Sequence, residues 1–357
     1  MIDFFTGWKN VKVLNCVLEN HSSTVEGGGI GLRDIYKKGC YNAQIENNKI
    51  YSNCKDEVIA IFAGGDTSLY PNETGGGYIK DVVLKNNYII GGKPNEELGP
   101  RVVGLTVGYQ LSPVYNVSYI DNVIEMYSAN YLFLYGKTDN VNFINNKIKI
   151  DASYQDKLYT IFCHNSHADN GNNINVVNNE FETINQSSIY TISNTGEEFS
   201  FKNNTITTDK IYRVFDSKSI YEDNIINATN IANTVYHNVK STKNNYINCK
   251  YLNVVFEFYN LNITDDILIE DHIVTEEISA NFMMFNGTDI YFNNHKVTFN
   301  NFIFETKKID AKYYYLAYGT NAIKDQGIIN FNDSHLSLYD GKDIANDLDN
   351  KVIVNYN

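Results

Sequence analysis

Two acidic stretches near the start of the chain carry residue types that could do chemistry. Glu26 and Asp34 lie in the first stretch, and Asp56 and Glu57 lie in the second. If the stretches stack as neighbouring strands, their carboxylates would lie one or two strand spacings apart. Glycoside hydrolysis requires two carboxyl groups about 5 to 9 Å apart, one of them with a raised pKa. We therefore expect Glu26, Asp34, Asp56 and Glu57 to be catalytic.

A second reaction class would depend on basic groups. β-Elimination from a uronic acid needs a cation at the substrate carboxylate and a base that removes the neighbouring proton. Arg33, Arg101 and His164 could supply these roles, and Asp56, Glu57 and Asp66 could hold Ca²⁺. Hydrolysis would need neither a metal nor another cofactor. A purely structural role also stays open, because charged residues flank the ends of strands in many sheets.

A recurring motif predicts the elements that must position these residues. FINNKI at 143–148 has close copies in IENNKI at 45–50, LKNNYI at 84–89 and FKNNTI at 201–206. Residues alternate between apolar and polar on both sides of the motif, which is typical of strands. Asparagine tolerates left-handed dihedrals, and stacked amides can form a hydrogen-bonded ladder. The motif therefore predicts a sharp corner between two strands.

The corners recur at irregular intervals along the whole chain. Aligned on the second turn residue, they fall at Cys16, Asn48, Asn87, Asn122, Asn146, Asn179, Asn204, Asn224, Asn245, Asp266, Asn301 and Ser334. A further apolar strand lies between successive corners, as in GGIGLRD at 28–34 and YLFLYG at 131–136. Three short strands per repeat predict an all-β solenoid of about eleven coils with three parallel sheets. We expect the solenoid over 1–266, with further coils and a C-terminal cap over 267–357.

The corner and the apolar strand together resemble the right-handed parallel β-helices of the pectate-lyase-like superfamily. That family has a V-x-I-x-N-N-x-I corner and a G-I-x-I-type first strand, which GGIGLRD and VVGLTVG at 102–108 match. KDEVIAI at 55–61 resembles the polygalacturonase motif, but Glu57 replaces its second Asp and Val58 its Cys. The G-H-G and R-I-K motifs of polygalacturonases are missing.

The resemblance implies a substrate groove over the first sheet. Alternation would point Ile30, Leu32, Ile59, Ile61, Leu105, Leu132 and Leu134 inward. The residues expected to face outward or border the groove, and thus to bind substrate, are Arg33, Phe62, Arg101, Phe133, Tyr135, Phe162 and His164. A covering loop or a neighbouring subunit could bury the same row instead.

Composition narrows the class of partner. The net charge of -13 and the pI of about 5.0 argue against nucleic acid and anionic membranes. No apolar run of membrane-spanning length occurs, and the N-terminus lacks the pattern of a signal peptide. Within the family, asparagine- and tyrosine-rich chains with irregular coils and no signal peptide resemble phage tail spikes or tail appendages. That resemblance implies a homotrimer that is located on a virion tail or otherwise outside the cell. It also implies that the protein binds a bacterial surface polysaccharide and cleaves it, as a hydrolase or as a lyase. A non-catalytic adhesin or structural module, and a secreted pectate-lyase-like lyase, are the alternatives.

Overall fold

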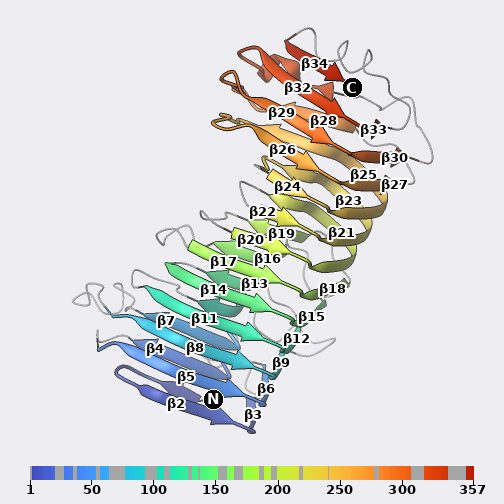
Figure 1. The fold of residues 1–357 in the computed structure, drawn as a ribbon. Coiled ribbons are helices and arrows are strands. Elements are labelled where there is room, and N and C mark those ends of the chain that lie inside the picture. The colour runs from blue at the N-terminus through green and yellow to red at the C-terminus, as the bar shows by residue number, and fades with distance from the viewer. Residues whose placement is uncertain are drawn as a thin grey trace. The chain divides into compact units, whose positions relative to one another are not determined.

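The computed structural model divides into two compact units, Met1–Ser200 and Phe201–Asn357. It describes residues 2–20, 28–34, 38–53, 57–63, 77–92, 103–107, 113–127, 131–135, 137–151, 159–164, 172–184, 189–193, 199–216, 220–239, 241–276, 281–306, 317–336 and 351–357. Figure 1 shows that the strands of each unit stack side by side and run in parallel. Each unit is described below by itself.

The first unit winds through three parallel sheets. The first sheet holds β1 (Ile2–Phe4), β4 (Ile30–Asp34), β7 (Ile59–Ala63), β10 (Val103–Val107), β13 (Tyr131–Tyr135), β16 (Tyr159–His164) and β19 (Ile189–Ser193). The second holds β2 (Lys9–Leu14), β5 (Cys40–Glu46), β8 (Ile79–Lys85), β11 (Val114–Ile120), β14 (Thr138–Ile144) and β17 (Asn172–Val177). The third holds β3 (Val17–Asn20), β6 (Lys49–Ser52), β9 (Tyr88–Gly91), β12 (Val123–Tyr127), β15 (Lys147–Asp151) and β18 (Glu180–Ile184). β20 (Phe199–Lys202) contains the boundary between the units.

The second unit keeps this winding with longer strands. Its second sheet holds β22 (Ile220–Glu222), β24 (Ser241–Lys243), β26 (Ile267–Glu270), β29 (Lys296–Asn300), β32 (Gly327–Asn332) and β34 (Val352–Tyr356). Three long strands run from the third sheet into the first: β21 (Thr205–Asp216), β23 (Ile225–His237) and β25 (Tyr246–Tyr259). The last coils separate them again into β27 (Ile273–Glu276), β30 (Ile303–Thr306) and β33 (His335–Leu336), beside β28 (Asn281–Asn286) and β31 (Ala317–Tyr318).

The predicted all-β solenoid is confirmed. In the described part of the chain, thirteen strands occupy the second-sheet position, and a single 3-10 turn, Thr320–Ala322, is the one helical segment. The coils continue past residue 266, because β26 pairs with β24 before it and with β29 after it.

A left-handed residue forms the first position of every described corner. The φ angles at this position lie between 48° and 59°, and the residue is always Asn or Asp: Asn15, Asn47, Asn86, Asp121, Asn145, Asn178, Asn203, Asp223, Asn244, Asp271, Asn301 and Asp333. These two residue types populate the left-handed region most readily after glycine. The corner is thus set by the dihedral preference of one residue.

From Asn48 to Asn245, the second residue of the corner carries a buried amide that joins successive coils. Oδ1 of Asn87 accepts the backbone N–H of Asn48 at 3.0 Å, and Oδ1 of Asn122 accepts that of Asn87 at 2.9 Å. Asn146 and Asn179 continue this amide ladder in the first unit. In the second unit, Asn204, Asn224 and Asn245 form the same bonds.

The alignment predicted for two late corners is wrong. The corner assigned to Asp266 lies at His272, whose carbonyl accepts the backbone N–H of Ile303. At the following corner, Asn301 is the left-handed first residue and Phe302 takes the buried second position. No Asn-Asn pair marks the first of these corners, so the motif carried no signal there. The stacked rings of His272 and Phe302, with centroids 5.8 Å apart, replace the amides.

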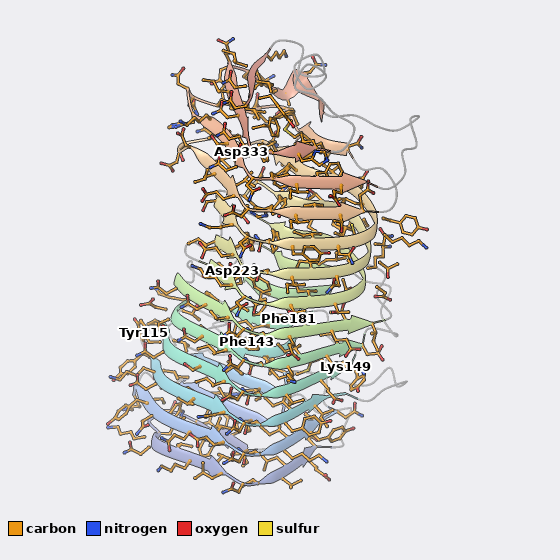
Figure 2. All side chains as sticks on the ribbon, turned by 45° about the vertical axis from the view of Figure 1, so that its right-hand side comes forward. Tyr115, Phe143, Lys149, Phe181, Asp223 and Asp333 are labelled. Carbon is orange, nitrogen blue, oxygen red and sulfur yellow. The ribbon has the colours of Figure 1, made fainter. Side chains whose placement is uncertain are left out.

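The space inside the coils is filled largely by aromatic rings. In the first unit, Tyr119 contacts Phe133 and Phe143 at centroid distances of 5.8 and 5.2 Å. Figure 2 shows Phe143 and Phe181 on the ribbon of this unit. In the second unit, Phe299 stacks on Phe331 at 4.8 Å. Each fully buried ring stabilises the fold by about 2 to 3 kcal/mol.

Candidate functional site

Asp34, a predicted catalytic residue, organises a loop. Its side chain is fully buried and accepts three backbone N–H groups, from Lys38, Gly39 and Tyr78, at 2.9 to 3.2 Å. A Cβ atom on Gly77 would lie 2.5 Å from its Oδ2, so the backbone of the next coil also closes over it. Both carboxylate oxygens therefore hold backbone in place.

Glu57 does not lie beside Asp34. The register of β4 and β7 pairs Ile30 with Ile59 and Asp34 with Ala63, whereas Glu57 precedes β7. The two carboxylates thus sit at opposite ends of paired strands, roughly 20 Å apart along the chain direction. The carboxylate pair that hydrolysis needs is not formed by these two residues. The other members of the predicted set, Glu26 and Asp56, lie outside the described residues.

Arg33 contacts the first coil. Its Nε lies 3.5 Å from Oδ1 of Asp3, and its guanidinium lies 5.8 Å from the centroid of the Phe5 ring. Burial raises the pKa of Asp3, and the charge of Arg33 partly opposes this shift. The substrate-binding role of Arg33 stays a prediction. Arg101 lies outside the described residues.

The predicted outward orientation of Phe133 and Phe162 is wrong. Both rings are buried, and their centroids lie 5.7 Å apart in the core. The register places Phe133 beside Leu105 and Phe162, in the column that contains Ile30 and Ile59. The sequence YLFLY is apolar on both faces, so it did not fix which residues point inward, and a shift by one residue exchanges the faces. These two rings cannot form a sugar platform.

Three further predicted residues cannot be placed by their side chains. Phe62, Tyr135 and His164 lie on strands of the first sheet, but only their backbone is described. Tyr135 pairs with Val107 and His164. Their substrate-binding roles stay predictions.

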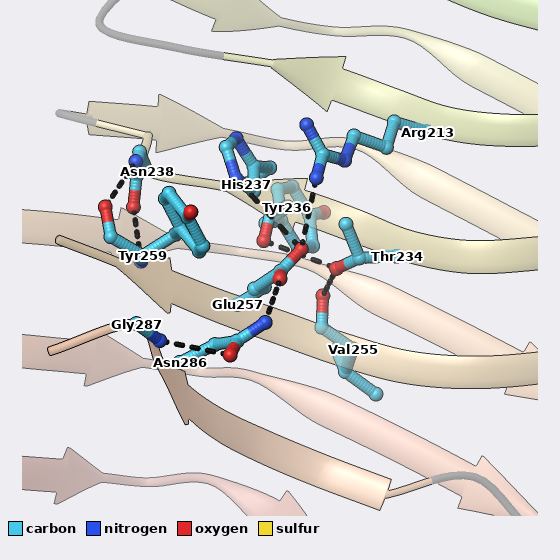
Figure 3. Close-up of polar contacts among 10 residues, drawn as sticks. All are labelled: Arg213, Thr234, Tyr236, His237, Asn238, Val255, Glu257, Tyr259, Asn286 and Gly287. Carbon is cyan, nitrogen blue, oxygen red and sulfur yellow. Dashed lines mark hydrogen bonds and ion pairs between the residues drawn. The ribbon is translucent and has the colours of Figure 1, made fainter. Parts of the chain in front are cut away.

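A cluster of charged side chains that sequence reasoning missed lies on the first-sheet position of the second unit. Glu257 stands at its centre, between the guanidinium of Arg213, the imidazole of His237 and the amide of Asn286 (Figure 3). We call these four residues the Glu257 cluster. They come from the successive strands β21, β23, β25 and β28, and register makes His237 the direct neighbour of Glu257.

Alternation along β25 explains why Glu257 faces outward. Phe256 stacks on Tyr236 at 4.7 Å and Phe258 on Phe285 at 5.3 Å, and all four rings are buried in the core. Because successive side chains of a strand point to opposite faces, Glu257 lies on the outer face. Its side chain is nevertheless only 2% exposed, since neighbouring groups cover it.

The contacts of Glu257 are electrostatic on one oxygen and hydrogen-bonded on the other. Oε2 lies 3.6 Å from Nη2 of Arg213 and 3.7 Å from Nε2 of His237, and Oε1 accepts a hydrogen bond of 3.1 Å from Nδ2 of Asn286. The first two distances exceed hydrogen-bond length, so these contacts are electrostatic. Buried charges are costly unless paired, so the carboxylate and the Arg213 guanidinium compensate each other at this point of the sheet.

An exposed aromatic ring stands next to the cluster. Tyr259 is 44% exposed, and its ring centroid lies 6.3 Å from that of His237. Its backbone is fixed by Asn238, which accepts the N–H of Tyr259 at 2.8 Å and donates to its carbonyl at 3.0 Å. Thr234 braces the same strand pair through its hydroxyl, which donates to the carbonyl of Val255. Figure 3 shows these contacts around Glu257.

The arrangement can bind an acidic sugar and move a proton. A guanidinium presents planar donors that match a carboxylate, and an aromatic ring offers a flat apolar face to a sugar ring. A carboxylate beside imidazole orients the ring and stabilises its protonated form. The register pairs Glu257 with His237 and Met284, whereas Arg213 lies opposite Thr234, so no single column of the sequence marked this site.

Metal and membrane features are absent from the described residues. No group of three or more His, Cys, Asp or Glu side chains among them could hold a metal ion. Asp56 and Asp66, expected near Ca²⁺, lie outside this part of the chain. Nor does any helix of the described segments have the length and apolarity needed to cross a membrane.

Comparisons with known proteins add no family assignment. No protein-family model, no curated protein and no solved structure matches the chain.

Proposed function

We propose that the protein binds a bacterial surface polysaccharide, in the manner of a phage tail spike or tail appendage, and cleaves it at the Glu257 cluster. The observation that carries this proposal is the position of the cluster on the outer face of the first-sheet strands. The resemblance to pectate-lyase-like β-helices puts the substrate groove over that sheet. Arg213, His237 and Glu257 supply there the charge and proton-transfer groups of a sugar-cleaving site.

β-Elimination fits the cluster better than hydrolysis, because the described contacts of Glu257 are with a guanidinium, an imidazole and an amide, and none is with a second carboxylate. Arg213 would neutralise the uronate carboxylate, and His237 would remove the proton from the adjacent carbon. The electron pair of that C–H bond forms a C=C bond, the bond to the glycosidic oxygen breaks, and the leaving oxygen takes up a proton. Glu257 would orient His237 and stabilise its protonated ring.

The test incubates the full chain with purified bacterial surface polysaccharides. Ultraviolet absorbance of the unsaturated product reports elimination, and new reducing ends without that absorbance report hydrolysis. His237→Gln should lower the rate by about 100-fold or more, because general-base catalysis contributes that much. Glu305→Gln, an exposed change on β30, should leave the rate unchanged. Equal rates for both variants would remove the cluster from the mechanism.

Binding without cleavage is the second candidate function. The burial of Glu257 favours it, since a carboxylate held between Arg213 and His237 also ties together the coils of β21, β23 and β25. An adhesin would bind a polysaccharide of the panel without forming product from any of them.

The proposal also includes a homotrimer located on a virion tail or otherwise outside the cell. Ile225, Tyr246 and Ile273 support self-association, because they are exposed in register on three successive coils. Such an apolar stripe is typical of surfaces that another chain covers. Sedimentation equilibrium would test the oligomeric state, and a monomer at all concentrations would contradict it.

A further inference from the structure

A row of alternating basic and aromatic residues crosses the outer face of the second sheet in the first unit. Register places Lys9 beside Tyr41, Tyr41 beside Lys80, and Lys80 beside Tyr115. Figure 2 shows Tyr115 at the margin of the ribbon in this unit. Neighbouring members of the row are about 4.8 Å apart at the backbone, because they belong to adjacent parallel strands.

A second series of left-handed residues explains why the row projects. The residue after each member has a positive φ: Asn10, Asn42, Asp81 and Asn116 lie between 53° and 61°. The pairing skips this residue, since Tyr41 pairs with Lys80 and Ala43 with Val82. Such a bulge puts two successive side chains on the outer face. The burial pattern of β5 agrees, because Tyr41 is half-buried and Asn42 exposed ahead of buried Ala43.

The two ammonium groups converge on one ring. Nζ of Lys9 lies 5.3 Å and Nζ of Lys80 lies 5.7 Å from the centroid of Tyr41. Lys80 also lies 6.0 Å from the centroid of Tyr78, whose ring packs on Gly39 so closely that a Cβ there would lie 2.7 Å from it. Tyr78 is 38% exposed, and one part of its ring packs against Gly39.

The charges around the row favour an anion. The nearest carboxylate along the chain is Asp81, whose Oδ1 accepts a hydrogen bond of 2.9 Å from Asn116. Asp139, the neighbour beyond Tyr115, accepts one of 2.8 Å from Asn173. Neither carboxylate forms an ion pair with Lys9 or Lys80 in the described structure. In a chain of net charge -13, two converging lysines form a local positive site.

We infer that Lys9, Tyr41, Tyr78 and Lys80 form a binding site for an anionic sugar of the target polysaccharide. The carboxylate or phosphate of the sugar binds at the ammonium groups that flank the Tyr41 ring. The apolar face of a neighbouring sugar ring stacks on the exposed rings of Tyr78 and Tyr115. This inference rests on the proposed polysaccharide binding but places a contact in the first unit, distinct from the Glu257 cluster.

The experiment measures binding of three soluble oligosaccharides of equal length to the full chain by calorimetry. One contains uronic acid, one is phosphodiester-linked and one is neutral. The double variant Lys9→Gln/Lys80→Gln should weaken binding of the anionic oligosaccharides about tenfold, because each exposed charge contact contributes modestly. The charge-matched control Lys49→Gln/Lys149→Gln changes the third sheet and should leave binding unchanged. Figure 2 shows Lys149 on the other side of the ribbon from Tyr115.

The outcomes separate this inference from the proposed function. Equal affinity of the wild type for neutral and anionic oligosaccharides overturns the inference, as does an unchanged affinity in Lys9→Gln/Lys80→Gln. In either case binding itself would still support the proposed function. Binding of none of the three oligosaccharides, and of no polysaccharide in the panel, would overturn both. A preference for the uronate or for the phosphodiester would identify which anion the site takes.

Discussion

The side-chain amide of Asn87 donates a hydrogen bond of 3.0 Å to Oδ1 of Asn122, one coil further along the chain. The same oxygen accepts the backbone N–H of Asn87 at 2.9 Å, and Nδ2 of Asn122 donates to the carbonyl of Leu84 at 3.0 Å. One buried side chain therefore satisfies polar groups of two neighbouring coils, and the amide ladder repeats this arrangement.

Removing one amide of the ladder should be costly. Asn122→Ala leaves buried donors of Asn87 and the carbonyl of Leu84 without this partner. We expect a loss of about 3 kcal/mol in the free energy of unfolding, and faster hydrogen exchange at the backbone N–H of Asn87. Asn142→Ala removes an amide on the outer face and should cost no more than about 0.5 kcal/mol. Equal losses in the two variants would show that the ladder contributes little.

The left-handed corner position should discriminate by backbone preference. Asp223 has a φ of 57°, and its Oδ1 accepts a hydrogen bond of 2.7 Å from Asn244. Asp223→Asn should be nearly neutral, whereas Asp223→Val should cost about 2 kcal/mol, because a branched Cβ clashes in this region. Asp223→Gly keeps the conformation but loses the hydrogen bond and should fall between them. Denaturant unfolding measures all three, and a Val variant as stable as the Asn variant would contradict the argument.

His272 should make stability depend on pH. Burial lowers its pKa to about 4, and its Nδ1 contacts the hydroxyl of Tyr236. The unfolded histidine takes up a proton near pH 6.5, before the folded one does, so protonation favours unfolding. The contribution of neutral His272 is complete above pH 6.5 and is lost as the pH falls toward 4. The loss amounts to about 3 kcal/mol.

The matching variant tests this directly. His272→Asn restores the residue type of the amide ladder and should remove this part of the pH dependence between pH 6.5 and 4. His335→Gln, at an exposed position on β33, should leave the dependence as it is. If the free energy of unfolding of wild type and of His272→Asn changed with pH in the same way, His272 would not be the source of this pH dependence.

The Glu257 cluster should also contribute to stability. Glu257→Ala leaves Arg213 and His237 facing each other without the carboxylate that both contact. We expect a loss of at least about 2 kcal/mol, as when one partner of a buried ion pair is removed. Glu257→Gln keeps an acceptor for Asn286 and should lose less. A free energy of unfolding unchanged in Glu257→Ala would mean that the cations are held by other groups.

The sequence predicted how the chain winds into coils. It predicted less well which side chains of each strand point into the core. The Asn-Asn corners could be predicted from the sequence, because few residue types have the dihedral preference and the hydrogen-bonding groups that these corners need. The outward orientation predicted for Phe133 and Phe162 is wrong. A strand that is apolar on both faces does not show in its sequence which residues point into the core. The catalytic role of Asp34 stays a prediction, and only the structure shows the three backbone N–H groups that its side chain accepts. Glu257 was missed because its partners come from strands about 20 residues apart, a distance that no local pattern encodes.

The amide ladder has a consequence for how such a protein can change. Asn48 and Asn87 are 39 residues apart, whereas Asn204 and Asn224 are 20 apart, yet the joining bonds measure 3.0 and 2.9 Å. The spacing between successive coils is therefore independent of the number of residues in each coil. Doubling a flexible excursion adds only about 0.6 kcal/mol of closure entropy. The length of chain between two corners can accordingly change while the hydrogen bonds that join the corners stay the same.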